Sequence, residues 1–263
     1  MQYDHVFLPK KFKTFSSFIR SKREVVKIMK LKVHIEKSGY EEKESAIENI
    51  SFTVGEGELV GLIGPNGAGK STTIKTILGL TRHMAGQVEW AETSNYAYIP
   101  EQPSFYDELT LWEHITALGT FLQEDESSFL PRANRLIERF SLEHALHDYP
   151  GSFSKGMQQK LMLIHAFLMQ PDLYIIDEPF IGLDPIASRL FLDMLKEEQK
   201  RGAGILLCTH VLDTAEKICD RFLLISNGRL MLEGTLEELQ EKTGLSGGSL
   251  LDCFYFAVKG APA

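Results

Sequence analysis

The stretch Gly64-Pro65-Asn66-Gly67-Ala68-Gly69-Lys70-Ser71-Thr72 decides the fold of this chain. It reads G-x-x-x-x-G-K-S, in which the glycines let the backbone wrap closely around a phosphate chain and turn its N–H groups toward it. At this spacing Lys70 reaches the outer phosphates and the Ser71 hydroxyl binds Mg²⁺. The stretch therefore predicts a site for a nucleotide phosphate chain together with Mg²⁺.

The flanking sequence supports this interpretation. Residues 58–63 form a short apolar run that predicts a buried strand, and residues 73–78 predict a helix. Strand, glycine loop and helix together place phosphates at a helix N-terminus, where free N–H groups and the helix dipole favour anions.

Composition restricts the class of protein. The chain has 263 residues, of which 43% are hydrophobic, so it is long and apolar enough for a sizeable core. A net charge of −8 argues against a nucleic-acid partner. No apolar run approaches the roughly 20 residues that cross a bilayer, so a membrane role requires a partner chain. The three cysteines show no C-x-x-C pairing, which fits a reduced, cytosolic setting.

Residues 1–28 differ from the rest because they are basic and carry Phe12, Phe15 and Phe18 at roughly helical spacing. One interpretation is an amphipathic segment that lies on anionic lipid or against a partner helix. The alternatives are a loosely ordered extension, or a stretch upstream of a start at Met29.

Strand and helix patterns alternate after this segment, which predicts an α/β fold with parallel core strands. The expected strands are 30–35, 46–54, 58–63, short runs near 88 and at 96–99, 173–176, 204–208, and a hairpin of 222–225 with 229–232. The expected helices are 73–78, a helical stretch over 110–149, one from 154, then 186–200, 213–218, and a tail from 235 with a break at 247–248.

Two carboxylates, Asp177 and Glu178, end the all-apolar strand 173–176, where their burial is costly unless a ligand uses the charge. Because ligands of α/β folds bind at the carboxyl ends of the strands, we assign Asp177 to Mg²⁺ through bound water and Glu178 to the attacking water. The competing interpretation is a pair of helix-capping residues before Pro179. His210, at another strand end, is expected near the γ-phosphate, although such a histidine is often structural. Gln102 is a candidate ligand of Mg²⁺ or of the water.

In this order the motifs resemble the ATP-binding subunit of an ABC transporter, over residues 31–238, and most closely the Ecs-type bacterial exporter ATPases. The resemblance implies a P-loop NTPase core at 29–101 and 160–233, a mixed sheet with an antiparallel β subdomain, a helical subdomain at 102–159 and a helical tail at 234–263. It also assigns nucleotide or catalytic roles to the adenine-stacking Tyr40, the Walker A residues Asn66, Gly67, Ala68, Gly69, Lys70, Ser71 and Thr72, the Q-loop Gln102, the signature residues Ser154, Lys155, Gly156 and Met157, the Walker B residues Asp177 and Glu178, the D-loop Asp184 and the switch His210.

The signature departs from the family's Leu-Ser-Gly-Gly-Gln, because Lys155 replaces the first glycine and Met157 the glutamine. Ser154 and Gly156 remain, so a hydroxyl and a close backbone N–H at a helix N-terminus are kept. Lys155 either adds positive charge near a phosphate or points to solvent, and solvent is the expectation because lysine ammonium groups are seldom buried.

The resemblance implies the following function. ATP and Mg²⁺ are held between two ATPase subunits, expected to be identical copies in head-to-tail arrangement, at the cytoplasmic face of a membrane. Hydrolysis drives a separate integral membrane permease, with export favoured over import. A second hypothesis is a soluble ATP-dependent switch that acts on ribosomes or DNA. A GTPase is disfavoured because the string Asn-Lys-x-Asp is absent.

Overall fold

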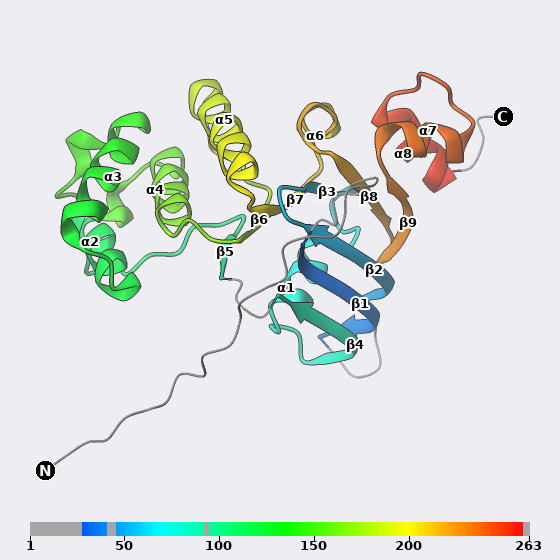
Figure 1. The fold of residues 1–263 in the computed structure, drawn as a ribbon, viewed down its shortest axis with the longest axis horizontal. Helices are drawn as coiled ribbons and strands as arrows, with labels where there is room; N and C mark the ends of the chain where they lie inside the picture. The colour runs from blue at the N-terminus through cyan, green and yellow to red at the C-terminus, as the bar shows by residue number, and fades with distance from the viewer. Residues whose placement is uncertain (1–27, 41–45, 92–94, 260–263) are drawn as a thin grey trace, which may run out of the picture.

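The computed structural model describes residues 28–40, 46–91 and 95–259. Figure 1 shows a helical lobe of α2, α3 and α4 on one side and a β lobe of β1, β2 and β4 on the other, with the central strands between them. The basic segment predicted at residues 1–28 lies outside the described residues except for Ile28.

A nine-stranded sheet runs through the described part of the chain in the order β4-β1-β2-β9-β8-β3-β7-β6-β5. In its core, β3 pairs in parallel with β7 and β8, and β6 pairs in parallel with β5 and β7. All residues of β3, β6 and β7 are buried, as their continuous apolar runs predict. The core strands are β3 (Leu59–Ile63), β5 (Tyr96–Ile99), β6 (Leu173–Asp177), β7 (Gly204–Thr209) and β8 (Arg221–Ser226).

The β lobe is antiparallel because β1 (Met29–Gly39) pairs with both β2 (Ile47–Gly55) and β4 (His83–Trp90). Leu31, Val33 and Ile35 are buried between exposed neighbours, as the alternation in the sequence predicts. The strand continues further than expected, through Gly39. The reason is that β2 and β4 continue to pair with β1 along this extension.

The hairpin predicted around Asn227-Gly228 joins β8 to β9 (Arg229–Gly234). A parallel bridge between Glu48 and Arg229 connects β9 to β2, so the β lobe and the parallel core form one mixed sheet. The fold class expected from the sequence is therefore confirmed.

In the described part of the chain, six helices lie between the strands in sequence, and α2 and α3 pack with α4 in the helical lobe beside the sheet. The six are α1 (Lys70–Ile77), α2 (Leu111–Leu122), α3 (Glu126–Arg139), α4 (Lys155–Leu168), α5 (Pro185–Arg201) and α6 (Leu212–Ile218), with 3₁₀ turns at Glu143–Ala145 and Pro150–Ser152. A capping box starts α2, in which the Thr110 hydroxyl accepts from the Glu113 N–H and the Glu113 carboxylate accepts from the Thr110 N–H. The helical interpretation of 110–149 is thus correct for most of its length.

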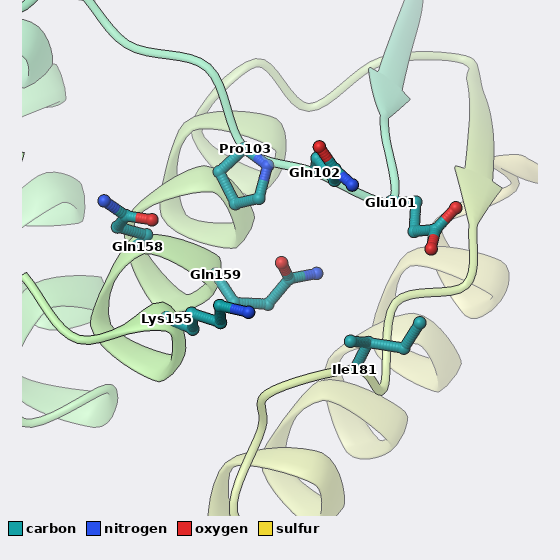
Figure 2. Close-up of a pocket in the computed structure, with 7 residues that line it drawn as sticks. All are labelled: Glu101, Gln102, Pro103, Lys155, Gln158, Gln159 and Ile181. Carbon is teal, nitrogen blue, oxygen red and sulfur yellow. The ribbon is translucent and has the colours of Figure 1, made fainter.

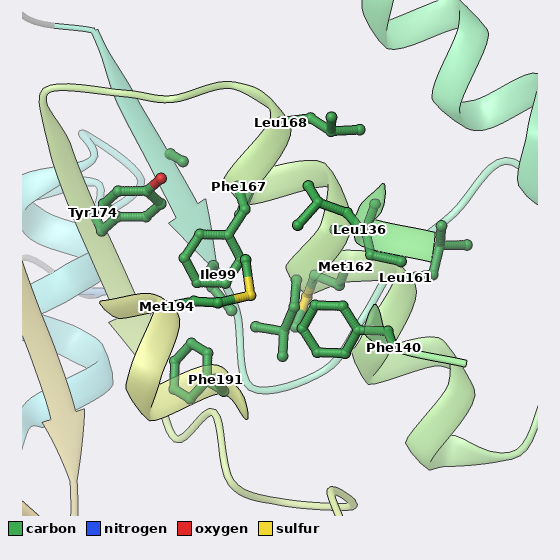
Figure 3. Packing of buried hydrophobic residues seen from close by; sticks show 14 of the residues in the cluster. Ile99, Leu136, Phe140, Leu161, Met162, Phe167, Leu168, Tyr174, Phe191 and Met194 are labelled. Atoms are coloured by element: carbon green, nitrogen blue, oxygen red, sulfur yellow. The ribbon is translucent and has the colours of Figure 1, made fainter. Parts of the chain in front are cut away.

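One buried cluster connects the helical lobe to the sheet (Figure 3). Leu136 and Phe140 of α3 and Leu161 of α4 belong to the same cluster as Tyr174 of β6 and Phe191 of α5. Because burial of apolar surface is favourable, this contact holds the lobe beside the sheet. The Arg139–Glu197 and Lys160–Asp184 ion pairs add polar contacts between the lobe and α5 with its N-cap.

His165 of α4 is largely buried in this lobe, beside His114 and Phe105. Burial, with a smaller contribution from His114, lowers the pKa of His165 to about 4. A lowered pKa in the folded state contributes stability that is present above the unfolded value near 6.5 and is lost as the pH falls toward 4.

Between these two pH values, we expect the free energy of unfolding of His165→Phe to fall by about 3 kcal/mol less than that of the parent protein. Urea unfolding at pH 7.5 and at pH 4.5 measures the effect, with the exposed His147→Gln as control. Equal losses of stability in the His165 variant and the parent would contradict it.

The tail forms two helices, α7 (Leu236–Thr243) and α8 (Leu250–Lys259), with the predicted break at Gly247-Gly248. Leu239, Leu250 and Cys253 pack with Phe222 and Leu224 of β8. Within the described ranges, the helices are too short or too polar to span a bilayer.

Candidate functional site

The glycine loop 64–69 closes tightly at the end of β3. A methyl group at Gly64 would overlap the carbonyl oxygen of Ile225, so a larger residue does not fit. Gly69 has a φ of 105° at the N-terminus of α1, a conformation that favours glycine. The loop borders a cavity of about 340 Å³, whose lining includes Asn66, Gly67, Gly69, Lys70, Ser71, Thr72, Glu101, Glu178, Ile181 and His210.

Lys70 lies at the floor of this cavity and is only 5% exposed. Its Nζ donates to the carbonyl oxygens of Gly64 at 2.8 Å and Pro65 at 3.2 Å, and lies 3.2 Å from Glu178 Oε1. A buried ammonium needs this set of acceptors because unpaired burial of a charge is costly. Lys70 is therefore held in place before any phosphate arrives.

Glu178 is held from a second side by His210. The two lie 2.9 Å apart between Glu178 Oε2 and His210 Nδ1, and the His210 backbone N–H donates to the same oxygen at 3.4 Å. An ionised Glu178 requires that Nδ1 carry the proton and donate. Glu178 has a φ of 47°, so its backbone adopts the left-handed conformation that places the carboxylate over the cavity.

Asp177 is buried next to Glu178, and its Oδ1 has no hydrogen-bond partner among the described residues. Burial raises the pKa of Asp177; the Ser71 hydroxyl, which hydrogen-bonds the carboxylate, opposes this, and the nearby Glu178 and Glu101 add to it. A hydroxyl and a carboxylate with a free oxygen are the donors that Mg²⁺ prefers, so the residues fit this ion. The described part of the chain forms no cluster of three or more His, Cys, Asp or Glu side chains able to hold a metal.

The buried Asp177 carboxylate is expected to cost stability. Because its pKa is raised in the folded state, its contribution is favourable below the unfolded pKa and is lost as the pH rises through the folded value. We expect Asp177→Asn to raise the free energy of unfolding of the nucleotide-free protein by about 1 kcal/mol at pH 7.5, and by less toward pH 4.

Urea unfolding at pH 7.5 and at pH 4 measures the free energy of unfolding of Asp177→Asn, with Asp193→Asn, at a partly exposed position, as the control. A loss of stability at pH 7.5 would contradict the argument.

The structure separates Gln102 from the other candidates. Gln102 lines a second cavity of about 410 Å³ between the helical lobe and the sheet, together with Lys155, Gln158 and Gln159 (Figure 2). Of the two residues Glu101 and Gln102 after β5, Glu101 borders the phosphate cavity. The sequence interpretation missed Glu101. No local signal in the sequence distinguishes it from Gln102, because both are polar residues that follow Pro100.

The signature residues 154–157 lie outside the phosphate cavity of their own chain. Ser154 caps α4, accepting from the Met157 N–H at 3.3 Å, and both Ser154 and Lys155 are exposed. A methyl group at Gly156 would approach the Gly182 carbonyl oxygen to 2.8 Å, so the signature packs closely on the D-loop. Lys155 is exposed to solvent, as expected, and it also borders the second cavity.

Tyr40 and Asp184 lie apart from the phosphate cavity. Tyr40 is 45% exposed, and the Lys75 Nζ is 5.8 Å from the centre of its ring. Asp184 caps α5, accepting from the Ala187 N–H at 2.8 Å, and lies 3.3 Å from Lys160 Nζ of α4. Asp184 thereby connects the D-loop to the signature helix.

A glycine loop at the carboxyl edge of a parallel sheet, with a buried lysine and two strand-end carboxylates beside it, defines a P-loop nucleotide-binding protein. The family model described as "ABC transporter" matches residues 47–181. The chain belongs to the ABC transporter family, as one of its ATP-binding subunits, and this family hydrolyses ATP.

Relatives and solved structures agree with this family. The chain is 60% identical over 230 residues to "Uncharacterized ABC transporter ATP-binding protein YthP" of Bacillus subtilis (strain 168), covering 88% of this chain and 97% of the relative. It is 44% identical over 218 residues to "ABC-type transporter ATP-binding protein EcsA" of the same organism, covering 79% of this chain and 88% of that relative. The solved structure described as "Structure of ATP binding subunit of ABC transporter" matches with a TM-score of 0.82 and 43% identity, over 88% of this chain and 100% of that chain. The resemblance to Ecs-type ATPases is confirmed, and the alternative of a soluble switch on ribosomes or DNA is not supported.

Proposed function

We propose that this subunit hydrolyses ATP with Mg²⁺ in a head-to-tail dimer of two copies, and that this cycle drives a separate membrane permease. The observation that carries the proposal is the buried Lys70–Glu178–His210 arrangement, with the free Asp177 oxygen beside it. Lys70 supplies a cation for phosphate and Glu178 a carboxylate for water in one cavity, and the buried Asp177 beside Glu178 offers an oxygen ligand for Mg²⁺.

The residues divide the chemistry among them. The N–H groups of the loop 66–69 and the Lys70 ammonium bind the β- and γ-phosphates at the N-terminus of α1. Ser71 and Asp177 would hold Mg²⁺, which would supply positive charge against the phosphate oxygens. Glu178 orients the attacking water and accepts its proton, and His210 holds that carboxylate in place.

The position of the signature supports the proposed dimer. Ser154, Lys155, Gly156 and Met157 are at the N-terminus of α4 but do not border their own chain's phosphate cavity. An exposed helix N-terminus favours an anion, and in a head-to-tail dimer the partner's γ-phosphate supplies it. Two further residues belong to this proposed interface. Tyr40 stacks on adenine, and Asp184 contributes as part of the D-loop.

Export through a permease is favoured by the names of relatives. A chain 34% identical to this one is "Fluoroquinolones export ATP-binding protein Rv2688c" of Mycobacterium tuberculosis, and another is "Nod factor export ATP-binding protein I" of Burkholderia lata. The proposed location is the cytoplasmic face of the membrane, where the subunit is held by the permease.

The test is purification of the full chain from membranes in mild detergent, followed by mass spectrometry of its companions and an ATPase assay with and without EDTA. We expect an integral membrane protein to co-purify and turnover to stop when EDTA removes divalent cations. Turnover unaffected by EDTA would contradict the Mg²⁺ requirement. If no membrane protein co-purifies with the chain, the proposed coupling to a permease is contradicted.

A further inference from the structure

The chain between β5 and α2, residues 100–110, contributes to the walls of both cavities. Glu101 lines the phosphate cavity and the second cavity, and Gln102 and Pro103 line the second cavity. Figure 1 shows this β5–α2 segment running from the sheet to the helical lobe. Its position beside the phosphate cavity therefore depends on how the lobe holds it.

His114 of α2 holds this segment at its middle. The residue is 5% exposed, and its Nε2 lies 3.1 Å from the backbone nitrogen of Tyr106, whose N–H donates to it. Nε2 accepts only when it carries no proton, so Nδ1 carries the proton of the neutral ring and donates to the Thr110 carbonyl oxygen at 2.8 Å. The two hydrogen bonds thus require the neutral imidazole in one tautomer.

An aromatic cluster extends this contact to the signature helix. The Phe105 ring lies edge-on to His114 and to His165 of α4, with ring centres 5.6 Å and 6.3 Å apart. The centres of the two imidazoles are 5.9 Å apart, and the Tyr106 ring stacks on His114 at 6.3 Å. The β5–α2 segment, α2 and α4 therefore meet at His114.

A second proton on the His114 ring is incompatible with this arrangement. Imidazole changes charge between pH 5 and 8, and a proton on Nε2 would face the Tyr106 N–H, one donor against another. The titratable groups that face His114 are Tyr106 in the segment, Glu113 in α2 and His165 in α4. Burial lowers the pKa of His165 to about 4, and hydrogen bonds from Thr110 lower the pKa of Glu113.

We propose that His114 is a positioning residue for ATP hydrolysis: its neutral ring attaches the β5–α2 segment to the helical lobe and so holds the wall of the phosphate cavity that Glu101 and Glu178 both line. This inference rests on the proposed function. The glycine loop and Lys70 bind phosphate without this segment, so the attachment is expected to affect kcat and to leave KM for Mg-ATP unchanged.

The test compares His114→Phe with His114→Gln in the full chain. Phenylalanine keeps a ring against Phe105 and His165 but cannot accept from the Tyr106 N–H, whereas the oxygen of a glutamine amide can. We expect His114→Phe to lower kcat by about 10-fold at pH 7.5 with KM unchanged, because a displaced cavity wall misplaces the reacting groups. His114→Gln is expected to keep most of the parent kcat. The control is His144→Phe, the same substitution at an exposed position, which should leave kcat unchanged.

The pH dependence separates this role from packing alone. A glutamine amide does not titrate, so the ratio of kcat in His114→Gln to kcat in the parent is expected to rise between pH 7.5 and pH 5.5. The rise should not exceed the factor of about 10 expected for complete loss of the hydrogen bond. A ratio that is constant with pH, or equal losses of kcat in His114→Phe and His114→Gln, would overturn the inference.

Hydrogen exchange of residues 103–109 reports the same attachment without hydrolysis. Measured by mass spectrometry at pH 7.5 without nucleotide, exchange is expected to be faster in His114→Phe than in the parent and in His114→Gln. A thermal melt checks that His114→Phe is folded. Equal exchange in the three proteins would overturn the inference. A parent protein that shows the exchange difference but hydrolyses no ATP would instead overturn the proposed function and support the attachment.

Discussion

Glu178→Gln is expected to lower the rate of ATP hydrolysis by about 10²- to 10⁴-fold while ATP binding is kept. The glutamine amide fits the same space between Lys70 and His210, which lie 3.2 Å and 2.9 Å from the carboxylate oxygens. It cannot accept a proton from water, so bound ATP persists. In the presence of Mg-ATP the variant should then remain a dimer, which light scattering after gel filtration measures.

Two controls make this result specific. Glu197→Gln removes another glutamate carboxylate, one that pairs with Arg139 at the surface, and is expected to hydrolyse ATP at the parent rate. The nucleotide-free Glu178→Gln protein should remain folded in a thermal melt. Hydrolysis by Glu178→Gln at the parent rate would show that Glu178 is not the base. A variant that binds Mg-ATP and stays monomeric would contradict the proposed dimer.

The convergence of the loop, Asp177, Glu178 and His210 is predictable from sequence because it depends on topology. β3, β6 and β7 are parallel neighbours, so the residues that follow them meet at one edge. The motif at 64–72 then identifies which edge binds phosphate. Local pattern and strand order together are enough for this part of the site.

The distinction between Glu101 and Gln102 is not predictable in the same way. Both residues are polar, both follow Pro100, and the sequence interpretation chose Gln102 by resemblance. Which of them borders the phosphate cavity depends on the path of the chain after β5, where residues 101 and 102 lie in a bend. That path is set by tertiary packing, which a single sequence does not show.

The resting pairing of Lys70 with Glu178 is a second feature that only the structure shows. Both residues are expected at the site, but their assigned roles concern phosphate and water. In the structure they are 3.2 Å apart and form one buried ion pair. Each charge has the other as its partner, which explains how two ionised groups are buried side by side.

Lys70→Met is therefore expected to have two large effects. ATP affinity should fall by about 10²-fold or more, because charge-assisted hydrogen bonds to phosphate are worth about 1.5–3 kcal/mol each. Stability should fall by about 3–5 kcal/mol, because Glu178 is left as a buried carboxylate without its cation. Nucleotide titration and urea unfolding measure the two quantities separately.

The double variant Lys70→Met/Glu178→Gln separates these effects. With both charges removed, no buried ion is left unpaired, and the free energy of unfolding is expected to recover most of the loss. ATP affinity is then compared with that of Glu178→Gln alone, which has the same neutral residue at 178 and keeps the lysine. We expect the double variant to bind ATP about 10²-fold more weakly, since the lost phosphate contacts are independent of the ion pair. Equal affinity in these two proteins would show that Lys70 serves the fold and not the nucleotide.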